Sequence, residues 1–106
     1  MSGFIMVYVT CASKAEAEKI SQALLNEHLI ACANILGPVS SHFHWNGKID
    51  CAEEYLVIMK SRVDLFAALE QRVRGLHSYD VPEVLAVPIV EGSKAYLDWM
   101  NKALTH

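Results

Sequence analysis

The spacing of apolar residues along the chain distinguishes strand segments from helix segments. Four segments are extended or rich in β-branched and aromatic residues and predict strands, at residues 4–11, 31–45, 48–60 and 84–90. Three segments carry apolar residues at helical spacing and predict helices, at residues 14–28, at 63–76 and from Gly92-Ser93 onward. The elements therefore follow one another in the order β-α-β-β-α-β-α.

Short local motifs mark where these elements begin and end. Ser13 and Glu16 have the spacing of a capping box, in which a serine and a glutamate close the start of a helix. Asn46-Gly47 is a strong signal for a tight hairpin turn between two strands. Proline cannot donate a hydrogen bond to a neighbouring strand, so Gly37-Pro38 interrupts the second strand and Pro88 places the fourth at an edge.

The element order predicts an α+β fold. Two β-α-β units joined by a hairpin match the ferredoxin-like split pattern, here with a long hairpin and an extra helix at the C-terminus. A length of 106 residues favours a single domain spanning 1–106, with enough chain to bury one core.

The predicted hairpin is long for a domain of this size. A strand of about fifteen residues reaches on the order of 50 Å, whereas a folded chain of this length has a diameter of roughly 34 Å. The far end of the hairpin nevertheless carries the large apolar side chains of Phe43, Trp45 and Ile49. These residues predict the subunit interface of a homo-oligomer, because exposed apolar patches are usually covered by a partner. The alternative is a hairpin that bends at Gly37-Pro38 and packs on its own domain.

Composition and charge exclude several partners. With a net charge of −3 and an isoelectric point near 5.9, the chain offers no basic surface for nucleic acid. No apolar run approaches the roughly 20 residues that cross a membrane, so no membrane partner is expected. The N-terminus lacks the features of a signal peptide, and three cysteines without CxxC spacing fit free thiols in a reducing compartment. Together these features predict a cytoplasmic protein.

Cys11 and His77 are the candidate metal ligands. Cys11 ends the first strand close to a predicted helix N-terminus, which favours the thiolate that binds soft metals. In the split pattern the first and fourth strands are neighbours, so the loop that carries His77 should meet Cys11 at one end of the sheet. Thiolate and imidazole suit copper or zinc, but two ligands are too few for a closed structural site. The simpler interpretations are a half-buried cysteine and an exposed loop histidine.

The pairing of the two hairpin strands decides the role of His42 and His44. A two-residue turn places His42 opposite Cys51 and so groups two histidines with a thiol. A three-residue loop, Asn-Gly-Lys, instead pairs Trp45 with Ile49. We expect the second pairing, because it joins apolar to apolar side chains. The histidines then lie on the more polar face, and the stretch serves assembly with Trp45 as its anchor.

The sequence resembles the CutA divalent-cation tolerance family over about residues 5–104. The resemblance rests on the order and spacing of five segments, VYVTCASKAEAEKI, ALLNEHLIACANIL, SHFHWNGKI, RVRGLHSYDVPEVLAVPI and YLDWMN. It implies a cytoplasmic homotrimer with ferredoxin-like subunits, similar in architecture to the PII signalling proteins. It also implies an association with tolerance of divalent metals, without an established enzymatic reaction.

The resemblance points to a metal site as well. In some members of the family copper is ascribed to the cysteine of a first-strand TC motif and to a histidine of an HPYE-P loop, which correspond to Cys11 and His77 here. The chain departs from this pattern, since Ser78 replaces the proline, Asp80 replaces the glutamate, and Leu76 stands where some members have a second histidine. The expected function is therefore weak copper binding by a non-enzymatic trimer.

A cleft between the subunits of such a trimer is a second candidate site. Lys60, Tyr79 and Glu83 occupy positions at which they could line it. The corresponding alternative function is a PII-like sensor that binds a small anion or a nucleotide. For Lys60 and Glu83 the simpler interpretation is a solvated rim of salt bridges.

Overall fold

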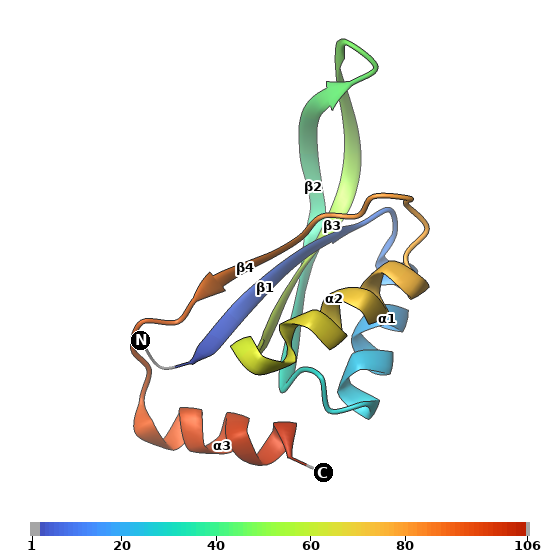
Figure 1. The fold of residues 1–106 in the computed structure, drawn as a ribbon. Helices are drawn as coiled ribbons and strands as arrows, with labels where there is room; N and C mark the ends of the chain where they lie inside the picture. Colours follow the sequence, from blue (N-terminus) through green and yellow to red (C-terminus); the bar gives the residue numbers. More distant parts are fainter. Residues whose placement is uncertain (1–2, 106) are drawn as a thin grey trace.

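The computed structural model of the protein describes residues 3–105, so residues 1, 2 and 106 of the predicted domain lie outside the described residues. The elements are β1 (Phe4–Cys11), α1 (Lys14–Asn26), β2 (Cys32–Trp45), β3 (Lys48–Arg62), the 3₁₀ helix η1 (Val63–Leu65), α2 (Phe66–Leu76), β4 (Val84–Pro88) and α3 (Lys94–Leu104). Figure 1 shows one sheet with α1 and α2 beside it and the β2–β3 hairpin rising above the other elements. The predicted element order and the α+β class are confirmed.

The four strands form one antiparallel sheet in the order β2-β3-β1-β4. β1 is an inner strand, paired with β3 over its whole length and with β4 from Ile5 to Val9. β4 lies at an edge, as Pro88 predicts, and Pro88 forms the last pair of its ladder, opposite Ile5. The C-terminal end of β1 therefore lies beside the start of β4 and the loop that precedes it.

Helices α1 and α2 cover one face of the sheet. Alternate residues of β1 and β3 turn toward the helices and pack on the apolar stripes of α1 and α2. The buried residues of this main core include Ile5, Val7, Val9, Cys11, Val57 and Met59 from the sheet, and Ala17, Ile20, Leu24, Leu69 and Val73 from the helices. Within residues 3–105, no helix has the length and apolar character needed to cross a membrane.

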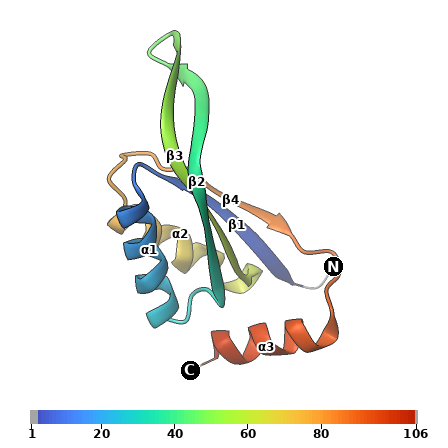
Figure 2. The ribbon, with the colours of Figure 1, turned by 180° about the vertical axis from the view of Figure 1, so that it is seen from behind.

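Helix α3 packs separately, at the end of the sheet opposite the hairpin tip (Figures 1 and 2). Ser93 caps the helix by accepting a hydrogen bond from the Tyr96 N–H. Met100 and Leu104 bury against Phe4 and Ala31 in a second, smaller core. Phe4 alternates with Ile5 along β1, so this second core lies on the sheet face that is turned away from α1 and α2.

The rest of that sheet face is apolar and largely uncovered. Tyr8 pairs with Leu85 and Met6 pairs with Val87 across β1 and β4. Leu85 is 60% exposed, Val87 is 38% exposed and Leu36, on the same face of β2, is 45% exposed. The described residues of one chain therefore leave apolar surface open on the sheet itself as well as on the hairpin.

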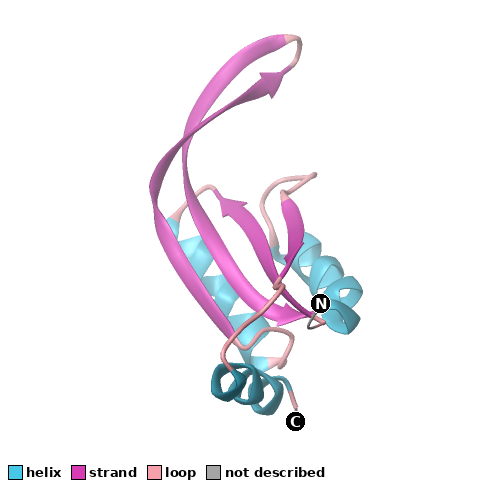
Figure 3. Cartoon of the chain, turned by 90° about the vertical axis from the view of Figure 1, so that its left-hand side faces the viewer, coloured by secondary structure: helices cyan, strands magenta, loops and turns pink. Residues whose placement is uncertain are grey.

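The β2–β3 hairpin extends well beyond the remaining elements, as its length predicts. The molecule measures 44 Å along its longest axis, against 26 and 23 Å along the others. A register shift between Leu36 and Val39 interrupts the ribbon where Gly37-Pro38 predicts it, and Figure 3 shows the ribbon arching as it leaves the sheet. Near the tip, Trp45 is 62% exposed and Ile49 is 76% exposed.

The pairing of the hairpin strands differs from the expected one. Trp45 pairs with Lys48 around a two-residue turn. Asn46 and Gly47 have φ values of 50° and 74°, the left-handed conformations that a type I′ turn requires at both positions. The twist of this turn matches the twist of the strands, and on an exposed ribbon this backbone preference outweighs apolar pairing. The predicted pairing of Trp45 with Ile49 was therefore wrong.

The observed register redistributes side chains between the two faces of the ribbon. His42 lies opposite Cys51, and His44 lies opposite Ile49. Because directly opposite residues share a face, Ile49 lies with the histidines, whereas Phe43 projects from the other face. The apolar residues predicted for one interface are thus divided between both faces.

Substitution of Gly37 should destabilise the bend of the hairpin. A Cβ atom at this position would lie 2.5 Å from Cδ2 and 2.9 Å from Cγ of Tyr55. We expect Gly37→Ala to lower the free energy of unfolding by about 1–3 kcal/mol, because the ring must leave its present place. Urea denaturation measures the change.

Gly75→Ala is the matched control. A Cβ atom at Gly75 meets no atom within 4 Å, and the residue lies inside α2. Alanine favours the helix, so this variant should gain roughly 0.5–1 kcal/mol. Equal stability of Gly37→Ala and the wild type would show that Tyr55 does not pack against the bend.

Candidate functional site

Three segments of the chain meet at one end of the sheet. β1 ends there with Cys11, α1 begins directly afterwards, and the loop that follows α2 passes beside both. His77, the first residue of that loop, has its Nε2 atom 2.7 Å from the carbonyl oxygen of Thr10. The structure therefore brings Cys11 and His77 to the same end of the sheet, as the topology predicts.

Cys11, Glu16 and His77 form a cluster of metal-ligand type. One donor atom from each residue lies within 4.8 Å of the other two. The thiol is buried, while the carboxylate and the imidazole are partly exposed. Within residues 3–105 this is the one group of three such donors that the fold gathers so closely.

Cys11 keeps its proton at neutral pH. Burial raises the pKa of its thiol to about 12, and the nearby carboxylates of Glu16 and Glu54 contribute to the increase. The sequence predicts the opposite, a thiolate favoured by the N-terminus of α1. That prediction was wrong, because desolvation and two negative charges outweigh the partial positive charge at a helix end.

Glu16 joins the start of α1 to the loop after α2. Its carboxylate accepts hydrogen bonds from the N–H groups of Ala12 (3.1 Å) and Ser78 (2.8 Å), and its own N–H donates to Ser13 Oγ (3.1 Å). The predicted capping box is present in its serine half only, since the glutamate binds Ala12 and Ser78 instead of the Ser13 N–H. Burial raises the pKa of Glu16. Hydrogen bonds from Ser78 and Ala12 and the proximity of His77 lower it by more than burial raises it, so the net pKa lies below its ordinary value.

Both ring nitrogens of His77 take part in hydrogen bonds. Nδ1 accepts from the Tyr79 N–H at 3.0 Å, and Nε2 donates to the Thr10 carbonyl. A backbone N–H only donates and a carbonyl only accepts, so this pattern assigns a neutral ring with its proton on Nε2. A metal ion at the cluster must therefore replace one of these two hydrogen bonds.

The cluster has the chemistry of a weak metal site. Sulfur, nitrogen and oxygen donors together suit zinc or copper. Binding requires loss of the thiol proton of Cys11 and release of one nitrogen of His77. Both requirements lower the affinity, and the first makes the affinity rise with pH.

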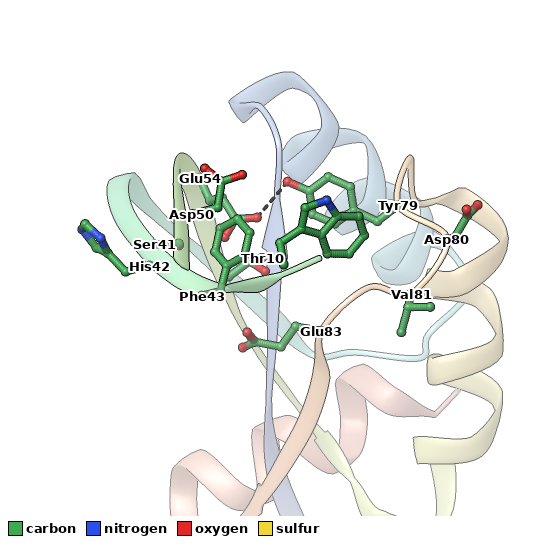
Figure 4. A pocket seen from close by; sticks show the side chains of 11 residues that line it. Thr10, Ser41, His42, Phe43, Asp50, Glu54, Tyr79, Asp80, Val81 and Glu83 are labelled. Carbon is green, nitrogen blue, oxygen red and sulfur yellow. Dashed lines mark hydrogen bonds between the residues drawn. The ribbon is translucent and has the colours of Figure 1, made fainter. Parts of the chain in front are cut away.

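A hollow of about 750 Å³ lies next to this cluster, between the arching hairpin and the loop after α2 (Figure 4). Phe43 and Trp45 from the hairpin and Tyr79 from the loop line it, so that part of its wall is aromatic. The predicted interface residues of β2 therefore face the same space as the predicted cleft residue Tyr79.

The hollow is acidic. Four carboxylates line it, those of Asp50, Glu54, Asp80 and Glu83. The lining residues include neither lysine nor arginine. Tyr79 donates its hydroxyl hydrogen to Glu54 Oε2 at 2.8 Å (Figure 4), and burial together with this carboxylate raises the pKa of Tyr79 to about 12. Burial and the charge of Glu54 also raise the pKa of Glu83. An anion entering the hollow would meet this negative charge.

Lys60 lies away from the hollow. Its Nζ atom donates to Asn34 Oδ1 at 3.1 Å and lies 5.6 Å from the ring centre of Tyr96. Of the three residues predicted for a cleft, the structure places Tyr79 and Glu83 around one hollow and Lys60 elsewhere on the sheet.

Glu16 and Glu54 contribute to this region although neither is among the site residues predicted from the sequence. Glu16 is partly buried, and Glu54 is only 8% exposed. For Glu16 the capping-box spacing was a usable signal, because it places the carboxylate next to the end of β1 and hence next to Cys11. Glu54 has no local signal, since its burial depends on a loop more than twenty residues away that folds over β3.

Comparison with known proteins gives one consistent family. The profile of the family described as CutA1 divalent ion tolerance protein matches residues 5–103. The divalent-cation tolerance protein CutA of Archaeoglobus fulgidus is 42% identical over 98 residues, covering 92% of this chain and 95% of that protein. The protein of the same name from Thermus thermophilus is 39% identical over 97 residues, covering 92% and 94%. The chloroplastic protein CutA of Arabidopsis thaliana is also 39% identical, and the match spans 54% of its length.

Solved structures give the same result. The structure of the periplasmic divalent cation tolerance protein CutA from Archaeoglobus fulgidus has a TM-score of 0.94 at 40% identity, covering 96% of this chain and 99% of that one. The divalent cation tolerance protein from Thermus thermophilus has a TM-score of 0.90 at 39% identity, covering 92% and 94%. The fold is thus similar to theirs along nearly the whole chain.

Glu16→Gln should weaken the junction between α1 and the loop after α2. It should also make the stability of the protein less sensitive to acid. The pKa of Glu16 in the folded protein lies below its ordinary value of 4.5, so its contribution to stability is present above that value and is lost as the pH falls. Glutamine does not titrate, and it loses a charge-assisted hydrogen bond. We expect a free energy of unfolding about 1 kcal/mol lower near pH 7 and a smaller loss between about pH 5 and pH 3.

Glu18→Gln is the control for this measurement, because Glu18 is exposed on the same helix. Its stability should stay within about 0.5 kcal/mol of the wild type. If Glu16→Gln and Glu18→Gln give the same acid denaturation curve, Glu16 does not hold the junction.

Proposed function

Because the chain belongs to the CutA1 divalent ion tolerance family, we propose that it contributes to metal tolerance by binding a metal ion weakly at Cys11, Glu16 and His77. The proposed ion is copper, which accepts sulfur and nitrogen ligands. One observation carries the proposal: a donor atom from each of the three residues lies within 4.8 Å of the other two. No catalytic reaction is proposed.

Glu16 completes the donor set. A thiolate and one imidazole are too few ligands to hold an ion well. The chain has Leu76 before His77, so a second histidine is not available at that position. The carboxylate of Glu16 reaches the cluster from α1 and supplies a third donor. Because the pKa of Glu16 is lowered, this donor is ionised at neutral pH.

The proposed affinity is low for two reasons that the geometry supports. The thiol of Cys11, with a pKa of about 12, must give up its proton. His77 must also exchange a hydrogen bond to Thr10 or Tyr79 for the metal. A site of this kind responds to a high concentration of metal and releases it when the concentration falls.

We further propose a homotrimer of ferredoxin-like subunits, similar in architecture to the PII proteins. The strand order β2-β3-β1-β4 supports the subunit fold. Two open apolar regions support assembly: the hairpin tip with Phe43 and Trp45, and the sheet face with Leu85 and Val87. A partner that covers the sheet face would meet the projecting hairpin as well.

The acidic hollow does not favour the alternative function, a sensor of a small anion or nucleotide. Four carboxylates repel such a ligand, and among the lining residues of one chain there is neither lysine nor arginine. We therefore retain metal binding as the proposed activity.

The proposed location is the cytoplasm. Cys11, Cys32 and Cys51 are free, which is the usual state of cysteine in a reducing compartment.

Titration with Cu²⁺ tests the metal site, and every protein in the series carries Cys51→Ser, because the exposed Cys51 thiol would otherwise compete for the ion. We expect Cys11→Ala and His77→Ala each to lower the affinity at least about tenfold, or roughly 1.4 kcal/mol. Because binding releases the thiol proton, the affinity of the protein that carries Cys51→Ser alone should rise about tenfold per unit between about pH 6 and pH 8. Isothermal titration calorimetry measures both effects.

Cys32→Ala is the matched control, since Cys32 lies at the other end of the sheet beside Asn34. Its copper affinity should equal that of the protein that carries Cys51→Ser alone. Copper bound with unchanged affinity by Cys11→Ala and His77→Ala would place the ion elsewhere in the protein.

Trp45→Ala tests the assembly. A large aromatic side chain that is 62% exposed at the tip of a ribbon should anchor a neighbouring subunit, so its loss should shift the protein toward smaller species. Light scattering coupled to size exclusion measures the mass. Trp99→Ala is the control, because Trp99 is 46% exposed on α3, far from the hairpin. An unchanged trimer in Trp45→Ala would exclude Trp45 as the anchor.

A further inference from the structure

The observed register of the hairpin places a second set of metal-ligand side chains on one face of the ribbon, although their donor atoms do not lie as close together as those of the Cys11 cluster. His42 and His44 lie two positions apart on β2 and therefore project from the same face of the ribbon. Cys51 lies directly opposite His42 on β3 and shares that face. All three residues are exposed, and although His42 is one of the residues that line the acidic hollow, Figure 4 shows its ring directed away from the other lining side chains.

The backbone at Cys51 indicates how closely the two strands bring these side chains. The Cys51 N–H donates to Asp50 Oδ1 at 2.8 Å, so it points away from β2. This is the feature of a non-hydrogen-bonded pair, in which the opposite Cα atoms are only about 4.5 Å apart and the side chains are close. His42 and His44 are separated by about 7 Å along the strand. Two imidazoles and one thiolate with these spacings can turn toward a common point.

The three side chains are also free to do so. In the described part of the chain, none of the three side chains has a hydrogen-bond partner. Metal binding here breaks no side-chain hydrogen bond of the described residues, in contrast to the cluster at Cys11, where the thiol is buried and both nitrogens of His77 are engaged.

We propose that His42, His44 and Cys51 bind a zinc ion on the outer face of the hairpin. Zn²⁺ takes imidazole nitrogen at about 2.0–2.1 Å and thiolate sulfur at about 2.3 Å, and three protein ligands leave its fourth position to water. The Cys51 thiol releases its proton to solvent on binding, and both imidazoles bind as neutral rings. Calcium and magnesium are not expected to bind, because they prefer oxygen ligands.

Protection of Cys51 from alkylation tests the site. The full-length protein is treated with iodoacetamide with and without Zn²⁺, and the modification of each cysteine is followed by mass spectrometry of its peptide. Cys51 is exposed and should react quickly with iodoacetamide, whereas the buried Cys11 should react slowly. The rate of modification of the Cys51 peptide therefore reports on the hairpin site. We expect Zn²⁺ to slow the alkylation of Cys51 at least about tenfold, because a metal-bound thiolate is a weak nucleophile. His42→Ala and His44→Ala should each return the rate to within about twofold of the zinc-free rate.

Three controls keep the result specific. Cys32 in the same sample should react at the same rate with and without Zn²⁺. Mg²⁺ in place of Zn²⁺ should give no protection. The double variant Cys11→Ala and His77→Ala should keep the protection of Cys51, which separates this site from the one proposed for metal tolerance.

Several results would overturn the proposal. One is equal protection in the wild type and in either histidine variant, and another is an absence of protection in the wild type. A third is a Cys51 that does not react even without Zn²⁺, because the outer face of the hairpin would then be covered. The substituted side chains are exposed, so circular dichroism should confirm that both variants fold as the wild type does.

Discussion

β1 pairs with β3 on one side and with β4 on the other, and this pairing positions the core, the helices and the candidate site. It buries one side of β1 under α1 and α2, and it fixes where the end of that strand meets the loop after α2. Three hydrogen bonds stabilise this junction. His77 donates to the Thr10 carbonyl, and the N–H groups of Ala12 and Ser78 donate to the Glu16 carboxylate. The candidate metal cluster is a consequence of that junction.

The same burial that stabilises the fold also limits the chemistry of the cluster. Cys11 belongs to the main core, and its thiol keeps its proton because it is shielded from water and lies near carboxylates. A ligand that is part of the core is held in place but is costly to ionise. The low affinity that we propose therefore follows from the position of the residue on β1, not from the kind of side chain.

The hairpin presents the opposite situation, a ribbon with little burial and two chemically different faces. The turn at Asn46-Gly47 sets the register and thereby decides which side chains share a face. One face carries Phe43 toward the hollow, and the other carries His42 opposite Cys51. Assembly and metal binding can therefore use separate faces of one ribbon, because strand side chains alternate.

The order of the elements, the edge position of β4 and the interruption at Gly37-Pro38 can all be predicted from the amino-acid sequence, because periodicity and proline chemistry act locally along the chain. The sequence also carries the family resemblance, and its predicted topology brings Cys11 and His77 together. The hairpin register, the protonated state of Cys11 and the burial of Glu54 became visible only in the folded chain. These depend on the twist of paired strands, on shielding from water and on contacts between distant segments, which no local pattern of residues encodes.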